Sequence, residues 1–198
     1  MSGRQPYPKG VAKKEEILRC AFERFANEGE KGVSLRTVAQ DSGLSLAGLR
    51  HYFESKDHLL IEMLRARDRS AEQRFDTAGS ALDLGEFMAE AMAANALDPA
   101  RSRLYVMLSA AAMDPNHPAH QYFRQRFQLF KDFAIRHLVH GQENGTIPQA
   151  TDPEFAAMAL LAATDGIQIQ WLIDPDIDMA DHIRTVWRKL ITPAQRCA

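Results

Sequence analysis

The sequence predicts an all-α protein, with a three-helix domain followed by a larger domain of about six helices. Apolar residues recur at spacings of three and four along most of the 198-residue chain, and no segment alternates like a strand. Helix start signals (Ser, Thr or Asp) and stop signals (Gly or Asp-Pro) separate these runs. Two of the runs are short and lie only a tight turn apart, between Ser34 and Phe53.

The first helix is predicted over the segment KKEEILRCAFERFANEGEKG. Its apolar residues fall on one face of a helix, and Gly29 is placed to end it. These residues are Ile17, Leu18, Ala21, Phe22 and Phe25.

Two short helices and a tight turn follow. Ser34 is expected to cap the first of them, and Gly43 to supply the left-handed residue that ends it. Ser45 is expected to cap the second, whose buried residues are Leu46, Leu49 and Phe53. A fourth helix is predicted from Ser55, its cap, to about Phe75.

The second short helix leaves a distinctive set of side chains facing outwards or sideways. Small residues at the start of a helix, followed by a guanidinium, an imidazole and a phenol side chain, suit a helix that enters a DNA major groove. An ordinary helical hairpin with a solvated outer face is the alternative. The outward residues are Ala47, Gly48, Arg50, His51 and Tyr52.

The order of these helix caps, turns and apolar residues resembles that of the amino-terminal domain of TetR-type transcriptional regulators. The resemblance lies in the helix ending in Gly, the SGLS turn, the Tyr-Phe pair and the Ser-Lys-Asp segment, and it covers residues 11 to 64. It implies a helix-turn-helix domain over 11–56, a ligand-binding and dimerisation domain over 57–193, and a nine-helix layout. Residues 1–10 are expected to form a flexible basic arm.

Two residues of the second short helix, Arg50 and Gly48, are unusual. The family often has an aromatic residue after the leucine at position 49, where this chain has Arg50. Arg50 could hold a phosphate or reach a guanine edge with its planar fork. Gly48 could bring the helix backbone close to the bases, or could pack against the first helix.

Charge is divided along the chain in the way that DNA binding needs. The formal net charge of −2 separates into +3 for residues 1–69 and −5 for residues 70–198. Arg4, Lys9, Lys13 and Lys14 are expected on or beside the arm, where they could follow the DNA backbone. Further candidate DNA contacts are Arg36, Ser45 and Lys56, the last reaching a phosphate from the start of its helix.

Five more helices are predicted after a turn at Thr77–Ser80. The first starts at Asp83 and stops before Pro99; the next runs from about Arg101 to Met113. A long helix begins near Pro118 and closes at Gly141–Gly145. Thr151 and Glu154 have capping-box spacing at the start of a helix that ends at Ile173, and Asp178 caps a last helix that ends near Ile191.

The last two long helices favour a homodimer. One carries a stripe of Phe155, Met158, Ala159, Ala162, Ile169 and Leu172, and its other surface is rich in small residues. The final helix adds Ile183, Val186, Trp187, Leu190 and Ile191. In the resembling family the corresponding helices form a four-helix interface between subunits, although both stripes could instead face the core of their own chain.

The middle helices suggest a pocket for a small apolar or amphipathic inducer. Asp165 is the most suggestive residue, because a carboxylate in a buried-looking helix needs a partner. That partner could be a protein cation, a water or a cationic ligand, and a structural role in bending the helix is the rival. The candidate ligand-binding residues are Met88, Met92, Tyr105, Phe123, Phe127, Asp165 and Trp171.

Several other functions find no support. Cys20 and Cys197 are too far apart in sequence to indicate a disulfide framework, so a reducing cytoplasm is expected. No run approaches the ~20 apolar residues of a membrane span. The pairs His117/His120 and His137/His140 lack the further ligands of a metal site, and no catalytic constellation or cofactor motif is present.

The sequence therefore predicts a cytoplasmic, non-enzymatic regulator, a homodimeric repressor that a small molecule releases from a palindromic operator of double-stranded DNA. A transcriptional activator, or a helical protein-interaction module without an inducer, is the alternative.

Overall fold

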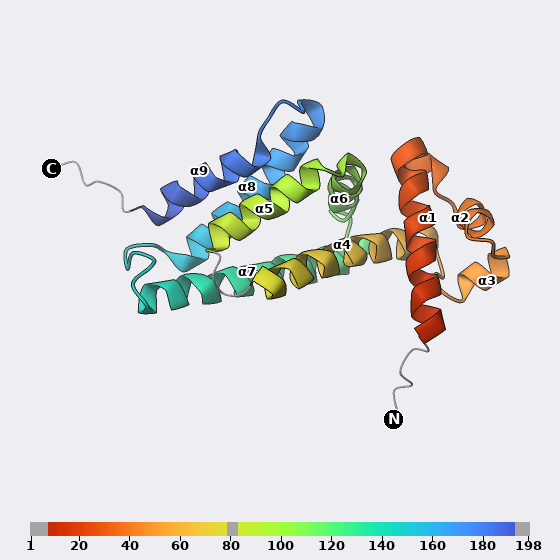
Figure 1. Cartoon of the computed structure of the whole chain (residues 1–198), viewed down its shortest axis with the longest axis horizontal. Coiled ribbons are helices and arrows are strands. Elements are labelled where there is room, and N and C mark those ends of the chain that lie inside the picture. Colours follow the sequence, from red (N-terminus) through yellow and green to blue (C-terminus); the bar gives the residue numbers. More distant parts are fainter. Residues whose placement is uncertain (1–7, 79–82, 193–198) are drawn as a thin grey trace, which may run out of the picture. The chain divides into compact units, whose positions relative to one another are not determined.

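The computed structural model describes the backbone of residues 8–78 and 83–192, and the side chains of 10–69 and 83–192. The described residues form nine α-helices and no strand (Figure 1). The chain divides into two compact units, residues 1–70 and 71–198. Part of the expected arm (1–7), part of the expected turn (79 and 80) and Cys197 lie outside the described residues.

The first unit contains α1 (Pro8–Gly32), α2 (Leu35–Asp41), α3 (Leu46–Arg50) and the first part of α4 (Lys56–Ala78). Residues 8–10, which were expected in the arm, already belong to α1. Gly29 breaks the regular helix, as predicted, with a left-handed φ of 69°. The core of this unit includes Ile17, Phe25, Leu49, Phe53 and Leu59, all at most 1% exposed.

The boundary between the units falls within α4 and not at its start. The division lies between Ser70 and Ala71. The end of the DNA-binding domain at Lys56 is a functional boundary and stays a prediction. Glu62 explains why the first half of α4 belongs with the earlier helices: it is buried, and its carboxylate accepts hydrogen bonds from Lys14 of α1 and from Arg65. Burial opposes the ionisation of Glu62, but these two cations outweigh it and lower its pKa.

The second unit contains α5 (Leu84–Ala96), α6 (Pro99–Ala111), α7 (Ala119–Glu143), α8 (Pro153–Ile173) and α9 (Met179–Ile191). In this unit α5 lies beside α9, and α8 packs against α6, α7 and α9 (Figure 1). Asp83 and Asp178 cap α5 and α9 as predicted, with each carboxylate accepting a backbone N–H of the first turn.

The predicted capping box at the start of α8 is wrong. Asp152, and not Thr151, is the N-cap, and its Oδ1 accepts hydrogen bonds from the N–H groups of Glu154 and Phe155 at 3.0 and 3.2 Å. The carboxylate next to Pro153 reaches two free donors, whereas Thr151 is buried one residue earlier.

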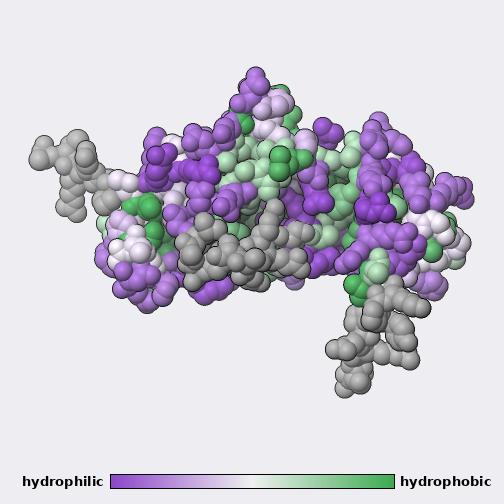
Figure 2. Space-filling view, in the orientation of Figure 1, coloured by the Kyte–Doolittle hydropathy of each residue, from purple (hydrophilic) through white to green (hydrophobic). Residues whose placement is uncertain are grey.

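α8 is a long helix with a mostly apolar sequence. Of the described helices, it alone is long and apolar enough to cross a membrane by length and composition. It contacts α5, α6, α7 and α9, as a core helix does, and a core helix passes the same test. Elsewhere the visible surface is mostly hydrophilic, and apolar residues reach it in separate patches (Figure 2).

Candidate functional site

The turn between α2 and α3 has the geometry of a helix-turn-helix motif. Ser34 caps α2, its Oγ accepting the Thr37 N–H at 3.1 Å. Gly43 adopts a left-handed φ of 66°, and the Leu44 N–H closes the turn on the Ala39 carbonyl at 2.8 Å. Ser45 then caps α3 by accepting the Gly48 N–H at 3.0 Å. The local signals in the sequence therefore predicted this turn correctly.

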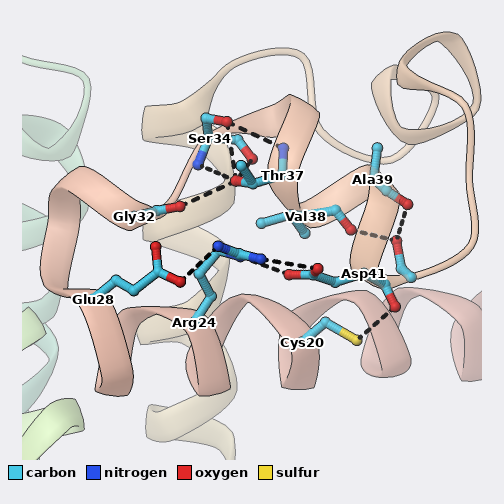
Figure 3. A network of polar contacts seen from close by, with 10 residues as sticks. Cys20, Arg24, Glu28, Gly32, Ser34, Thr37, Val38, Ala39 and Asp41 are labelled. Atoms are coloured by element: carbon cyan, nitrogen blue, oxygen red, sulfur yellow. Dashed lines mark hydrogen bonds and ion pairs between the residues drawn. The ribbon is translucent and has the colours of Figure 1, made fainter.

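Helix α1 holds α2 through a network of polar contacts (Figure 3). The Arg24 guanidinium binds both carboxylate oxygens of Asp41, at 2.6 and 3.0 Å, and also Glu28 at 2.8 Å. The hydrogen bond from Arg24 lowers the pKa of Asp41. At the other end of α2, the Thr37 hydroxyl donates to the Gly32 carbonyl at 3.1 Å. Both ends of α2 are thus tied to α1.

Two lysines assigned to DNA-backbone contact have intramolecular partners. The Lys13 ammonium donates to the Ser42 carbonyl at 2.8 Å and pairs with Glu16. The Lys14 ammonium binds Glu62 and lies 5.7 Å from the centre of the Phe53 ring. Both residues lie within α1 and join it to its neighbours, so they are not part of an extended arm.

Most of the candidate DNA-contact residues gather on the outer side of α2 and α3. Leu49 and Phe53 are fully buried beneath this surface, which fixes the orientation of α3. Tyr52, Gly48 and Lys56 are half-buried. The exposed members are Arg36, Ser45, Ala47, Arg50 and His51.

Gly48 does not serve close packing against α1. A Cβ at this position would lie 3.3 Å from Ser45 Oγ and 3.8 Å from Leu44 Cδ2, both in the preceding turn. The absent side chain therefore leaves the outer backbone of α3 uncovered, the condition that a close approach to a base edge requires.

Lys56 does not extend freely from the start of α4. Its ammonium donates to the Glu30 carbonyl at 2.9 Å and pairs with the Glu30 carboxylate at 3.1 Å. Glu30 lies just after the break at Gly29, far from Lys56 in sequence, so no periodicity could have revealed this partner.

The candidate ligand residues separate into two groups. Met88, Met92 and Trp171 belong to the main apolar core of the second unit, together with Leu160 and Ile167. The other four candidates gather between α6, α7 and α8. Tyr105 contacts Phe123 edge-on with ring centres 5.4 Å apart, and Phe123 lies 5.8 Å from Phe127.

Asp165 joins this second group through a hydrogen bond. The Tyr105 hydroxyl donates to Asp165 Oδ1 at 2.8 Å, and the Arg126 guanidinium lies 5.0 Å from the Tyr105 ring centre. A groove of about 640 Å³ lies against Asp165 and Phe127. Its other lining residues come from α7 and α8: Gln121, Arg124, Gln125, Gln128, Lys131, Met158, Leu161 and Ala162.

α8 carries an apolar stripe that its own chain leaves uncovered. Phe155, Met158 and Ile169 of the predicted stripe are 64%, 53% and 47% exposed, and Ile173 continues it. Leu172 and Ala159 are half-buried. The opposite face of α8 packs in the core, so the exposed stripe is not the face that its own chain covers.

The prediction that the apolar residues of α9 lie at a subunit interface is wrong for two of them. Ile183 and Trp187 are buried in the core of their own chain. The Trp187 ring packs over Gly85 of α5, and beside it the Arg184 guanidinium binds the Glu86 carboxylate at 2.6 to 3.1 Å. Val186, Leu190 and Ile191 are half-buried.

The histidine pairs serve local contacts. His120 Nδ1 lies 2.8 Å from the Ala112 carbonyl, and His137 Nδ1 lies 3.1 Å from the Phe133 carbonyl. Over the ranges whose side chains are described, no three residues of the His, Cys, Asp or Glu type come together as metal ligands would.

Known families match both units. Residues 17–63 match the bacterial regulatory proteins of the tetR family, and residues 83–193, more than half of the chain, match the C-terminal domain of BetI-type transcriptional repressors. The chain belongs to the TetR family of transcriptional regulators.

Individual relatives agree with this assignment. The chain is 24% identical over 180 residues to the HTH-type transcriptional regulator PksA of Bacillus subtilis (strain 168), covering 88% of this chain and 85% of the relative. A TetR transcription regulator from Haloarcula marismortui ATCC 43049 shares the fold with a TM-score of 0.78 and 19% identity, over 91% and 97% of the two chains. SmeT in complex with triclosan has a TM-score of 0.73 and 17% identity, over 92% and 93%.

Proposed function

We propose that the chain is a homodimeric repressor that binds a palindromic operator and leaves it when a small molecule binds. The observation that carries the proposal is the surface of α3: Leu49 within the helix and Phe53 just after it are fully buried and Leu46 is half-buried. Ala47, Arg50 and His51 instead face solvent. The family match to BetI-type transcriptional repressors supports repression rather than activation.

In this proposal α3 enters the major groove. Arg50 and His51 supply donors to base edges, Tyr52 lies at the side of the groove, and Ala47 and Gly48 allow a close approach. Arg36, Ser45 and Lys56 contact phosphates, which fixes the register of α3 on the duplex.

The exposed stripe of α8 supports a twofold dimer. Bulky apolar residues, Phe155 and Met158 at one end and Ile169 and Ile173 at the other, flank the small residue Ala162 near the middle. Two such helices can cross antiparallel at their small residues, with the bulky end of each against the opposite end of the other. A twofold axis pairs identical surfaces in this way. A dimer supplies two copies of α3, and entry into successive major grooves on one face of the duplex requires them ~34 Å apart.

The groove beside Asp165 is our candidate for the inducer site. Phe127, Leu161 and Met158 give it an apolar lining, and Asp165 with its Tyr105 partner gives it an oriented polar group. SmeT, a protein of similar fold, has been solved as a complex with triclosan, which supports a search for a small-molecule ligand here. We place Phe127 and Asp165 at the ligand. Tyr105 and Phe123 support them from within the protein, and Met88, Met92 and Trp171 belong to the core.

Release of DNA would follow from a shift between two arrangements of the dimer. α4 is one continuous helix that belongs to both units, so it can transmit a change from one to the other. An inducer needs to favour the spread-apart state by only ~1–3 kcal/mol to weaken DNA binding 5- to 150-fold. The coupling is reciprocal, so operator DNA should weaken inducer binding by the same factor.

Selection of DNA from a random duplex library tests the proposal. We expect the protein to enrich a palindrome and to bind it with a steep salt dependence, because phosphate contacts release counterions. Reporter expression under that palindrome should rise on deletion of the protein; a fall would make it an activator. Failure to bind any duplex in a salt-dependent way would favour a helical protein-interaction module. As a regulator bound to the chromosome, the protein would act in the cytoplasm.

A further inference from the structure

The ion pair between Lys56 and Glu30 neutralises a cation at the edge of the candidate DNA surface. Lys56 is the first residue of α4, and its side chain is 34% exposed. The Glu30 side chain, 50% exposed, approaches it from the last turn of α1. Two contacts hold the ammonium, one to a backbone carbonyl and one to a carboxylate.

These two contacts differ in their effect on a phosphate. The Glu30 carbonyl directs the ammonium without cancelling its charge. The Glu30 carboxylate offsets part of that charge, and its own negative charge would repel an approaching phosphate oxygen. A DNA phosphate therefore has to compete with Glu30 for Lys56.

We propose that Glu30 is a built-in competitor of DNA, which lowers the affinity of the protein for all duplexes by occupying Lys56. This inference rests on the proposed DNA-binding function. The carbonyl contact keeps Lys56 in position when the carboxylate is lost, so the Lys56 side chain stays directed while its charge becomes available. Glu30 thus sets the strength of binding without setting its sequence preference, because phosphate contacts carry no direct sequence information.

Glu30→Gln is the variant that tests this inference. Exposed ion pairs contribute about 0.2–1 kcal/mol, so the variant should bind the selected palindrome about 1.4- to 5-fold more tightly for each copy of the domain. The dependence of log K on log salt should steepen by about 0.9 for each Lys56 released. The sequence enriched from the random library should stay the same.

Two controls separate this mechanism from a change in net charge. Glu28→Gln removes the same charge two residues away in α1, but Glu28 pairs with Arg24 and not with Lys56, so a smaller gain is expected. Glu30→Gln in a Lys56→Ala background should bring no gain. A gain that persists without Lys56, or one that Glu28→Gln reproduces, overturns the inference. Absence of salt-dependent binding by the wild type would instead contradict the proposed function.

Discussion

A Cβ atom added at Gly85 would lie 2.0 Å from Cδ1 of Trp187, so the first turn of α5 and the indole of α9 fit together only because residue 85 has no side chain. Arg184 and Glu86, one turn away on α9 and next in sequence on α5, pair beside this contact. The two helices are therefore joined by an apolar and an ionic contact at the same level.

Gly85→Ala should destabilise the protein despite the higher helix propensity of alanine. Forcing an extra methyl group into a packed core costs about 1–3 kcal/mol. The free energy of unfolding in urea measures the effect, and Trp187→Leu in the same chain should recover part of the loss. The loss in the double variant should therefore be smaller than the sum of the losses in Gly85→Ala and in Trp187→Leu alone, and an additive loss would show that the two residues do not interact.

Gly48→Ala should separate stability from DNA binding. Replacing a helical glycine with alanine stabilises a helix by up to ~1 kcal/mol. A new Cβ would lie 3.3 Å from the Ser45 hydroxyl, a tight contact that offsets part of this gain. Thermal unfolding should therefore be unchanged or shifted upwards. Operator affinity should fall if the backbone of α3 approaches the bases. Unchanged affinity would place Gly48 outside the interface.

Arg50→Ala should distinguish between base reading and phosphate binding. Loss of a bidentate contact with guanine costs ~1–3 kcal/mol and relaxes the preference at one operator position. Loss of a phosphate contact weakens binding to all sequences and flattens the salt slope by about one. Titration of the selected operator and of its single-base variants decides between these outcomes, and normal binding to all of them would remove Arg50 from the interface.

Ile169→Glu should dissociate the proposed dimer without unfolding the chain. Ile169 is 47% exposed in the single chain, so a carboxylate there is solvated in the monomer but costs several kcal/mol in an apolar interface. Leu129→Glu, on α7 and 68% exposed, is the matched control that should leave the dimer intact. Sedimentation velocity measures the oligomeric state of both variants. Trp187→Glu is unsuitable, because it would place a charge in the core of the chain itself.

The stability of the protein should fall in acid partly through Glu62. Its pKa is lower in the folded chain than in the unfolded chain, so its ionised form stabilises the fold above the unfolded pKa of about 4.3. This stabilisation is lost as the pH falls through the folded pKa. Unfolding measured between pH 7 and 3 should show a smaller acid loss in Glu62→Gln than in the wild type. The exposed Glu23, changed to Gln, should not reduce the loss.

Local features of this fold could be predicted, and contacts between distant residues could not. Ser34, Ser45 and Asp178 cap their helices as expected, because a cap depends on residues three positions apart. At the start of α8 the rule failed only in choosing between Thr151 and the adjacent Asp152, both of which have side-chain acceptors.

Helical spacing identified which residues are apolar on one face, but not what that face packs against. Trp187 and Ile169 both fit an apolar stripe, yet one is buried and the other exposed. The same limit applies to the candidate pocket, where Met92 is core and Phe127 lines a groove. The partner of Lys56 comes from α1, and only the folded chain brings it close.

Polar contacts join both ends of α2 to α1, whereas the outward side chains of α3 do not contribute to such contacts. Within the described parts of the chain, no hydrogen bond or ion pair engages the side chains of Ala47, Arg50 or His51. Under the proposed role of α3, substitutions at these positions would change the side chains presented to DNA while leaving the stability of the fold almost unchanged. A few substitutions on this one short helix would therefore suffice to change the operator that the regulator recognises. Such a change in specificity would not require compensating substitutions elsewhere in the chain.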